Sequence, residues 1–160
     1  MHRTALLLAP LALALASCGS LPSINAPDIS GTVRGTPPAG NFVVTLAEVN
    51  PDGTAVKGGR SFSLPRDHRY DTYFFEFYDP ADTERAQDGV YELYCFGDVN
   101  GNGTFEADVE RRTRPNGKLV VLDRDGQSTT FTGLRPGLNE VQGTQATQWG
   151  NIKGHDLSWQ

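Results

Sequence analysis

The segment DVNGNGTFE, which begins at Asp98, carries the residues of this sequence best suited to binding a metal ion. Calcium is a hard cation that takes about six to eight oxygen ligands. Asp98, Asn100 and Asn102 recur at every second position, so a tight loop can turn their side-chain oxygens inward. Gly103 allows the sharp reversal that follows, and the backbone carbonyl of Thr104 can supply a further oxygen. The spacing therefore predicts a calcium-binding loop.

A carboxylate must return to the ion to complete its shell of ligands, and Glu106, Asp108 and Glu110 are all available. The first six positions of the loop fit the EF-hand pattern, but that pattern also needs Glu at position twelve and an entering helix. Val109 occupies position twelve, and the residues before Asp98 are predicted to form a strand. An EF-hand proper is therefore excluded.

The loop instead resembles the D-x-[DN]-x-[DN]-G loops found between strands in extracellular β-sandwich modules, such as the B-type repeats of surface adhesins. In those loops the closing carboxylate often lies a few residues after the glycine, which implies Glu106, and then Asp108, as the closing ligand here. The alternative is an Asn- and Gly-rich turn that binds no ion. Four acidic residues in this loop would repel one another without a cation, although Arg111 and Arg112 partly neutralise them.

The sequence holds few residues for catalysis. Of its three histidines, His2 lies near the N-terminus, and neither His68 nor His155 belongs to a recognisable motif. The signatures G-x-S-x-G, H-E-x-x-H and C-x-x-C are absent. We therefore expect a protein that is not an enzyme. An envelope hydrolase that uses paired carboxylates is the least favoured alternative.

Aromatic residues offer a second kind of binding site. If Phe74 and Tyr78 face outward with Trp149 or Trp159 nearby, they form a surface for a sugar or a peptide. The alternative, which we favour, is that these side chains pack under a loop or against a second sheet.

The N-terminus has the three parts of a secretory signal. A short basic stretch is followed by the apolar run ALLLAPLALALA, too short to span a bilayer, and then by Leu15-Ala16-Ser17-Cys18. This last segment resembles the bacterial lipobox, which implies cleavage before Cys18, a diacylglyceryl thioether on that cysteine, and acylation of the new amine, as by palmitate. We therefore expect residues 1–17 to be a signal peptide and Cys18 a lipidation site. The alternative is a soluble secreted protein in which Cys18 is incidental.

Lipidation would define where the protein acts. Residues 18–27 are small, polar and contain proline, which predicts a lipidated tether in front of a single domain over residues 28–160. Two or more acyl chains anchor a protein stably where one does not. The expected location is extracytoplasmic, in the cell envelope. Gly19 after the cysteine favours the outer membrane in a cell with two membranes.

Composition limits the partners further. The net charge of the chain is −5, and removal of Arg3 with the signal makes it more negative. An acidic chain is a poor partner for nucleic acid or for anionic lipid headgroups. Cys95 is the only cysteine besides Cys18, so a lipidated chain forms no internal disulfide, and we expect the Cys95 thiol to be buried. The expected partners are a membrane, through the lipid alone, and a protein or glycan of the envelope.

Short apolar stretches separated by Gly, Pro, Asn and Asp predict an all-β chain. We expect residues 28–160 to form one β-sandwich of the Greek-key type. The expected strands are residues 29–33, 41–49, a stretch within 56–64, 70–78, 90–96, 118–122, 129–132 and 138–141, with 118–122 and 129–132 paired as a hairpin.

Tyr91 opens the strongest of these strands, directly after the turn at Asp88-Gly89. A tyrosine at this place is typical of the tyrosine corner of Greek-key sandwiches, in which the hydroxyl bonds back to the backbone. An ordinary core tyrosine is the alternative.

Three short motifs carry a wider resemblance: ISGTV from Ile29, DGVYEL from Asp88 and DVNGNG from Asp98. Together they are similar to transthyretin-like and carboxypeptidase-regulatory-like sandwich domains of bacterial envelopes, over about residues 28–110. That resemblance implies a non-catalytic spacer, adhesive unit or accessory module. The expected function is therefore a lipid-anchored structural or interaction module with a calcium-stabilised loop, and a surface module that binds carbohydrate or peptide is the alternative.

Overall fold

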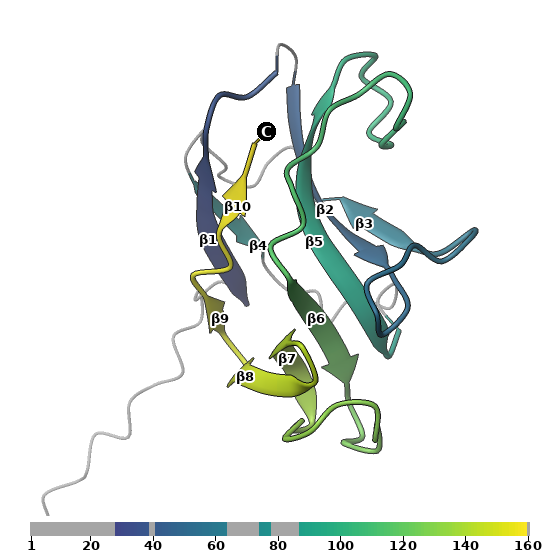
Figure 1. The fold of residues 1–160 in the computed structure, drawn as a ribbon, viewed down its shortest axis with the longest axis vertical. Coiled ribbons are helices and arrows are strands. Elements are labelled where there is room, and N and C mark those ends of the chain that lie inside the picture. Colours follow the sequence, from purple (N-terminus) through teal and green to yellow (C-terminus); the bar gives the residue numbers. More distant parts are fainter. Residues whose placement is uncertain (1–27, 39–40, 64–73, 78–86, 160) are drawn as a thin grey trace, which may run out of the picture.

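A computed structural model of the chain describes residues 28–38, 41–63, 74–77 and 87–159. The described residues form ten strands and no helix. The strands make two sheets that face each other as a β-sandwich (Figure 1), which confirms the predicted fold class. The predicted signal peptide, Cys18, the tether and Tyr78 lie outside the described residues. Among the residues that are described, no helix is long and apolar enough to cross a membrane.

The smaller sheet is built around β1 (Ile29–Arg34). This strand pairs antiparallel with β4 (Phe74–Phe77). It pairs parallel with two short strands near the end of the chain, β9 (Ile152–Lys153) and β10 (Leu157–Ser158). The C-terminal residues, for which no strand was predicted, therefore complete the sheet that the first strand begins.

The larger sheet has six strands in the order β3-β2-β5-β6-β7-β8. Strands β2 and β5 are neighbours in space but not in sequence, as in Greek-key folds. The six strands are β2 (Asn41–Glu48), β3 (Ser61–Ser63), β5 (Gly89–Asp98), β6 (Lys118–Asp123), β7 (Gly137–Gln142) and β8 (Gln145–Trp149).

The main core lies between the two sheets. Alternate residues of a strand point to opposite faces, so Tyr91, Leu93 and Cys95 of β5 share the inner face. They pack there in one cluster with Phe75 of β4 and with Trp159 after β10. The core therefore joins the centre of the larger sheet to both edges of the smaller one, at β4 and β10.

Tyr91 makes the hydrogen bond expected of a tyrosine corner. Its hydroxyl donates to the backbone carbonyl of Gln87, 2.6 Å away, and its ring is buried. This bond ties the start of β5 to the chain that leads into it.

The predicted hairpin between β6 and residues 129–132 is wrong, because β6 pairs with β7 along its whole length. The buried carboxylate of Asp123 accepts hydrogen bonds from the backbone N–H groups of Gln127 and Ser128, at 3.1 and 3.0 Å. The chain turns at 123–126, where the N–H of Gly126 donates to the carbonyl of Asp123 at 3.4 Å, and the bonds to the Asp123 carboxylate then hold the following residues in a longer loop. Phe131 then packs on the outer face of the sheet rather than in a strand beside β6.

Candidate calcium-binding loop

The loop of residues 99–110 is closed at its base by the larger sheet. Strand β5 carries Asp98 to the last position of the strand. The chain then returns beside β5, where the N–H of Gly97 donates to the carbonyl of Arg111 at 3.0 Å. The two ends of the loop are thus held next to each other, and the loop projects beyond the strands (Figure 1).

Asp98 is only 2% exposed, and both of its carboxylate oxygens accept hydrogen bonds from the loop. Oδ1 accepts from the N–H of Gly101 at 2.7 Å, and Oδ2 accepts from the N–H of Gly103 at 3.0 Å. Both glycines have a positive φ, 76° and 72°, which other residues rarely adopt. The two glycines therefore let the backbone wrap around this carboxylate.

Asn100 and Asn102 continue the pattern in the exposed part of the loop. Oδ1 of Asn100 accepts from the N–H of Asn102 at 3.0 Å, and Oδ1 of Asn102 accepts from the N–H of Thr104 at 2.7 Å. Such side-chain to backbone turns fix the positions of the amide oxygens. The alternation seen in the sequence thus corresponds to a series of similar turns.

The two acidic residues predicted to close the site are both exposed. Oε2 of Glu106 accepts from the side-chain amide of Asn100 at 2.6 Å, so Glu106 contacts the loop. Asp108 makes no hydrogen bond or ion pair within the described part of the chain.

The carboxylate that returns to the base of the loop is that of Glu110, an available residue that the sequence did not favour. Glu110 is 5% exposed. Its Oε1 accepts from the N–H of Val99 at 3.0 Å, and its Oε2 accepts from the N–H of Glu106 at 3.1 Å. No sequence signal set Glu110 apart from Glu106 and Asp108, because its position follows from the pairing of Arg111 with Gly97 of β5.

The side-chain oxygens of this loop have lone pairs that accept no hydrogen bond and could bind a cation. A carboxylate has about four lone-pair sites and an amide oxygen about two, whereas each side-chain oxygen of Asp98, Asn100 and Asn102 accepts a single hydrogen bond. Within the described residues, no three His, Cys, Asp or Glu side chains come together to hold a metal ion. A bound ion would therefore depend on amide and backbone oxygens beside Asp98 and Glu110, a mixture that fits calcium.

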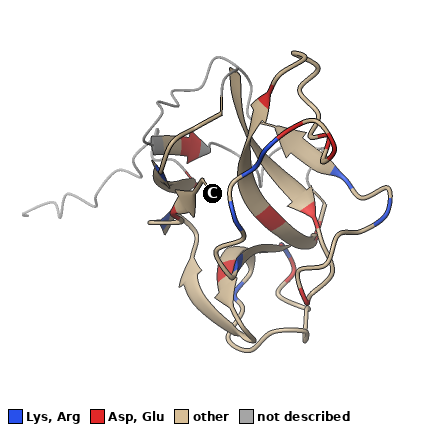
Figure 2. Cartoon of the chain, turned by 45° about the horizontal axis from the view of Figure 1, so that its top comes forward, with Lys and Arg blue, Asp and Glu red and all other residues tan. Residues whose placement is uncertain are grey.

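Asp98 lies at the end of β5 just before the loop, three acidic residues lie on its returning limb, and two arginines follow directly (Figure 2). Nη1 of Arg112 lies 2.9 Å from Oε2 of Glu92 on β5, and its guanidinium lies over the ring of Tyr94, 4.6 Å from the centroid. Arg112 is therefore engaged by the sheet. Its charge compensates the carboxylates of the loop less than the sequence suggested.

Phe105 packs the loop onto the outer face of the larger sheet. Its ring centroid lies 5.7 Å from that of Tyr94 and 5.6 Å from that of Phe96, with edge-to-face geometry in both pairs. Such pairs contribute about 0.5–1.5 kcal/mol each beyond the burial of their area. Order in this loop is therefore coupled to the packing of β5.

The two tryptophans considered for an aromatic binding surface lie in different environments. Trp159 is buried in the main core, whereas Trp149 is 41% exposed. The guanidinium of Arg135 lies over the ring of Trp149, 4.0 Å from its centroid. Phe74 is the first residue of β4, and Tyr78 lies outside the described residues. Of the two tryptophans, only Trp149 is at the surface.

A buried charge cluster surrounds Glu140 of β7 and was not predicted from the sequence. Nδ1 of His155 lies 2.9 Å from Oε2 of Glu140, and Nζ of Lys118 lies 3.3 Å from the same oxygen. Burial by itself raises the pKa of Glu140, but the hydrogen bond and charge of His155, the amide of Gln148 and the charge of Lys118 lower it to about 2. No motif signals this cluster, because strands β6, β7 and β8 and the link between β9 and β10 supply its members.

Comparison with known proteins yields no relative: no protein-family model, no curated protein and no solved structure matches this chain.

Proposed function

We propose that this protein is a non-catalytic module of the bacterial cell envelope, anchored by lipid on Cys18 and stabilised by calcium in the 98–110 loop. Its role is structural or lies in binding other envelope components. The observation that carries the calcium part is a pair of buried carboxylates, Asp98 and Glu110, at the two ends of one loop. Burying two carboxylates in one loop is costly unless hydrogen bonds and a cation compensate their charge.

The ion acts as a clamp in this proposal. Calcium sites of extracellular modules have dissociation constants of about 10⁻⁴–10⁻³ M. At one to ten times that concentration, binding stabilises the folded state by about 0.4–1.4 kcal/mol. For a domain of this size, such a gain raises the Tm by a few degrees. Phe105 transmits the order of the loop to Tyr94 and Phe96 on the sheet.

Thermal unfolding of the purified lipoprotein in detergent, with calcium or with a chelator, tests the clamp. We expect a Tm a few degrees higher with calcium, and we expect Asp98→Asn to abolish that difference. Asp123→Asn is the matched control, because Asp123 is another buried carboxylate that accepts two backbone hydrogen bonds, in a different loop. A calorimetric titration without heat, together with a Tm that the chelator leaves unchanged, would contradict the calcium proposal.

The anchor is supported by Leu15-Ala16-Ser17-Cys18 and is tested separately. We expect Cys18→Ala to move the protein from the membrane fraction to the soluble extracytoplasmic fraction. Cys95→Ala serves as the control and should stay with the membrane. A Cys18→Ala variant that remained membrane-bound would contradict the proposed lipid anchor.

Catalysis is not part of the proposed role. His155 is fully buried and its partner Glu140 is nearly so, which keeps this pair away from any substrate. Hydrolysis of envelope glycans or peptides that disappeared on changing one carboxylate of the 98–110 loop would overturn this view.

A further inference from the structure

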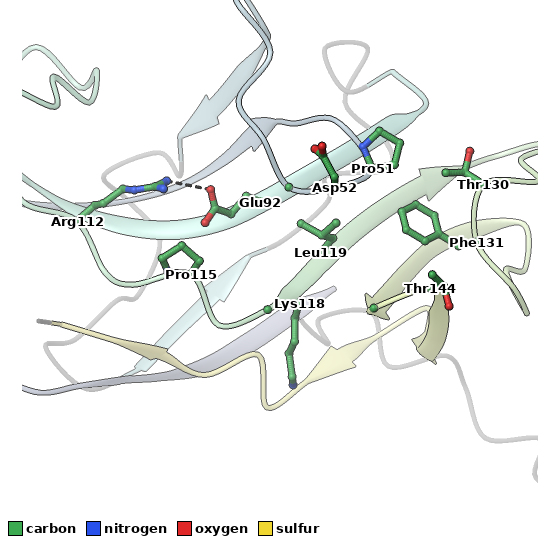
Figure 3. A pocket seen from close by; sticks show the side chains of 13 residues that line it. Pro51, Asp52, Glu92, Arg112, Pro115, Lys118, Leu119, Thr130, Phe131 and Thr144 are labelled. Atoms are coloured by element: carbon green, nitrogen blue, oxygen red, sulfur yellow. Dashed lines mark hydrogen bonds and ion pairs between the residues drawn. The ribbon is translucent and has the colours of Figure 1, made fainter.

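A groove of about 640 Å³ lies on the outer face of the larger sheet. Strands β5 and β6 form its base. Its walls are the turn after β2, the chain before β6, the loop after β6 and the turn between β7 and β8. Small-ligand sites usually have volumes of about 300–1,000 Å³. Figure 3 shows Arg112, Glu92, Leu119 and Phe131 in this order along the groove.

Glu92 of β5 brings an unsatisfied oxygen to this groove. The residue is 8% exposed, and its Oε2 accepts from Nη1 of Arg112 at 2.9 Å. Its Oε1 is buried and has no hydrogen-bond partner in the described part of the chain. An unpaired buried acceptor costs about 1–3 kcal/mol, and a charged one costs more. The terminal torsion of glutamate is soft, so the carboxylate can turn toward a donor in the groove.

The other charged side chains along the groove are engaged within the protein. Nζ of Lys118 bonds to Oε2 of Glu140 at 3.3 Å. Oδ1 of Asp52 accepts from both the N–H and the hydroxyl of Thr54, at 2.9 and 2.7 Å. Because these groups and the arginine beside Glu92 already have partners, the groove favours a ligand without net charge.

Beyond Glu92 the groove is apolar, lined by Leu119 of β6 and by Phe131 of the loop after β6 (Figure 3). At the far end, the exposed residues Thr130 and Thr144 present hydroxyls that make no hydrogen bond within the described residues. The groove thus runs from a hydrogen-bonding end, over an apolar surface, to a second hydrogen-bonding end.

We propose that this groove binds a neutral glycan chain. A sugar hydroxyl donates and accepts through the same atom, so one hydroxyl can donate to Oε1 of Glu92 and accept from Arg112. The C–H face of a sugar ring suits Leu119 and Phe131, and hydroxyls of the next sugar meet Thr144. A peptide bond carries its donor and its acceptor on different atoms that point in opposite directions, and therefore matches the Glu92–Arg112 pair less well. This inference gives the proposed interaction role a ligand class and rests on neither the calcium nor the anchor.

Calorimetric titration of the purified lipoprotein, in detergent and with chelator present, tests the groove independently of calcium. The probes are chitotetraose, cellotetraose, maltotetraose and a tetrapeptide of glycine, proline and alanine with both termini capped. We expect at least one tetrasaccharide to bind and Glu92→Gln to weaken that binding about tenfold, since a hydrogen bond to a charged group becomes a neutral one. Thr144→Val changes the exposed end of the groove and should weaken the binding of the tetrasaccharide about threefold. It tests the proposal independently if Glu92→Gln disturbs the fold.

Glu48→Gln is the matched control, because Glu48 forms a comparable ion pair with Arg60, 2.9 Å away, outside the groove. The Glu48→Gln variant should bind the tetrasaccharide with the same affinity as the unaltered protein. The proposal is overturned if none of the three sugars binds, if only the tetrapeptide binds, or if Glu92→Gln and Thr144→Val both bind a sugar as tightly as the unaltered chain.

Discussion

Nδ1 of His155 lies 2.9 Å from Oε2 of Glu140, and both side chains are buried. The backbone of His155 is held as well, because its N–H donates to the carbonyl of Ser30 on β1 at 3.0 Å. Since Glu140 belongs to β7, this pair joins the smaller sheet to the larger one inside the sandwich. A charged contact at this place makes the stability of the fold depend on pH.

Glu140→Gln should remove most of that dependence in acid. The pKa of Glu140 is lowered from 4.5 to about 2, despite burial, by His155, Gln148 and Lys118. A carboxyl whose pKa falls on folding stabilises the protein fully above its unfolded pKa, near 4.5, and loses that contribution as the pH falls toward 2. The contribution is on the order of 3 kcal/mol. Urea unfolding at a series of pH values should show a gap between the two proteins that is large at neutral pH and narrows in acid.

Asp125→Asn is the control for this experiment, because Asp125 is exposed in the loop after β6. Its unfolding curve should follow that of the unaltered protein at every pH. A gap between Glu140→Gln and the unaltered protein that stayed constant from neutral pH to acid would contradict the assigned role of the pair.

Glu110→Gln should weaken the proposed calcium clamp more than Asp108→Asn does. Glu110 is buried and holds the N–H groups of Val99 and Glu106, whereas Asp108 is exposed and makes no hydrogen bond within the described residues. We expect the calcium-induced rise in Tm to vanish in Glu110→Gln and to persist in Asp108→Asn. The opposite order would return the closing role to the residues that the sequence favoured.

Thiol counting distinguishes the two cysteines. Burial raises the pKa of the Cys95 thiol to about 12, so its reactive thiolate is scarce in the folded protein. We expect no reaction of Cys95 with iodoacetamide at about pH 8 until denaturant is added. After denaturation, mass spectrometry should find one alkylated cysteine if Cys18 carries a thioether. Two alkylated cysteines would contradict the proposed anchor, and rapid alkylation of the folded chain at Cys95 would contradict its burial.

Gly31→Ala should destabilise the sandwich. A methyl group at Gly31 would overlap the backbone carbonyl of His155 and lie 2.9 Å from Cε1 of Phe75. Overpacking of this kind costs about 1–3 kcal/mol, and a rigid carbonyl gives way less easily than a side chain. Gly89→Ala is the control, since its added carbon would meet only ordinary contacts with Tyr91, at 3.4 Å or more. Urea unfolding should show a lower midpoint for Gly31→Ala than for Gly89→Ala, with the same m-value. Equal midpoints for the two variants would contradict the close approach of His155 to Gly31.

Much of the fold followed from local sequence. Residues 90–96 were predicted as a strand and became part of β5, Cys95 was expected to be buried and is, and the turn before Tyr91 predicted the hydrogen bond of a tyrosine corner. The strands predicted at residues 29–33 and 118–122 agree with β1 and β6 to within one residue at each end. These features were predictable because period-2 patterning and turn residues act over a few neighbouring positions.

The partner of β6 was not predictable in the same way. Residues 129–132 have a composition suited to a strand, but the carboxylate of Asp123 organises the intervening loop and β7 takes the place beside β6. The short strands β8, β9 and β10 carry weak local signals. They are strands because an existing sheet edge offers them backbone partners, which is a property of the assembled fold.

Some features of the candidate site also follow from local sequence, and others depend on the packed chain. The sequence by itself determined the succession Asp98, Asn100, Asn102 and Thr104, because each turn in it involves residues close together along the chain. Only the tertiary structure decided that Glu110 returns to the loop, that Trp159 is buried, and that Glu92 lines a groove. These outcomes depend on which distant segments pack together. Burial and pairing are properties of the whole packed chain, and no single stretch of sequence encodes them.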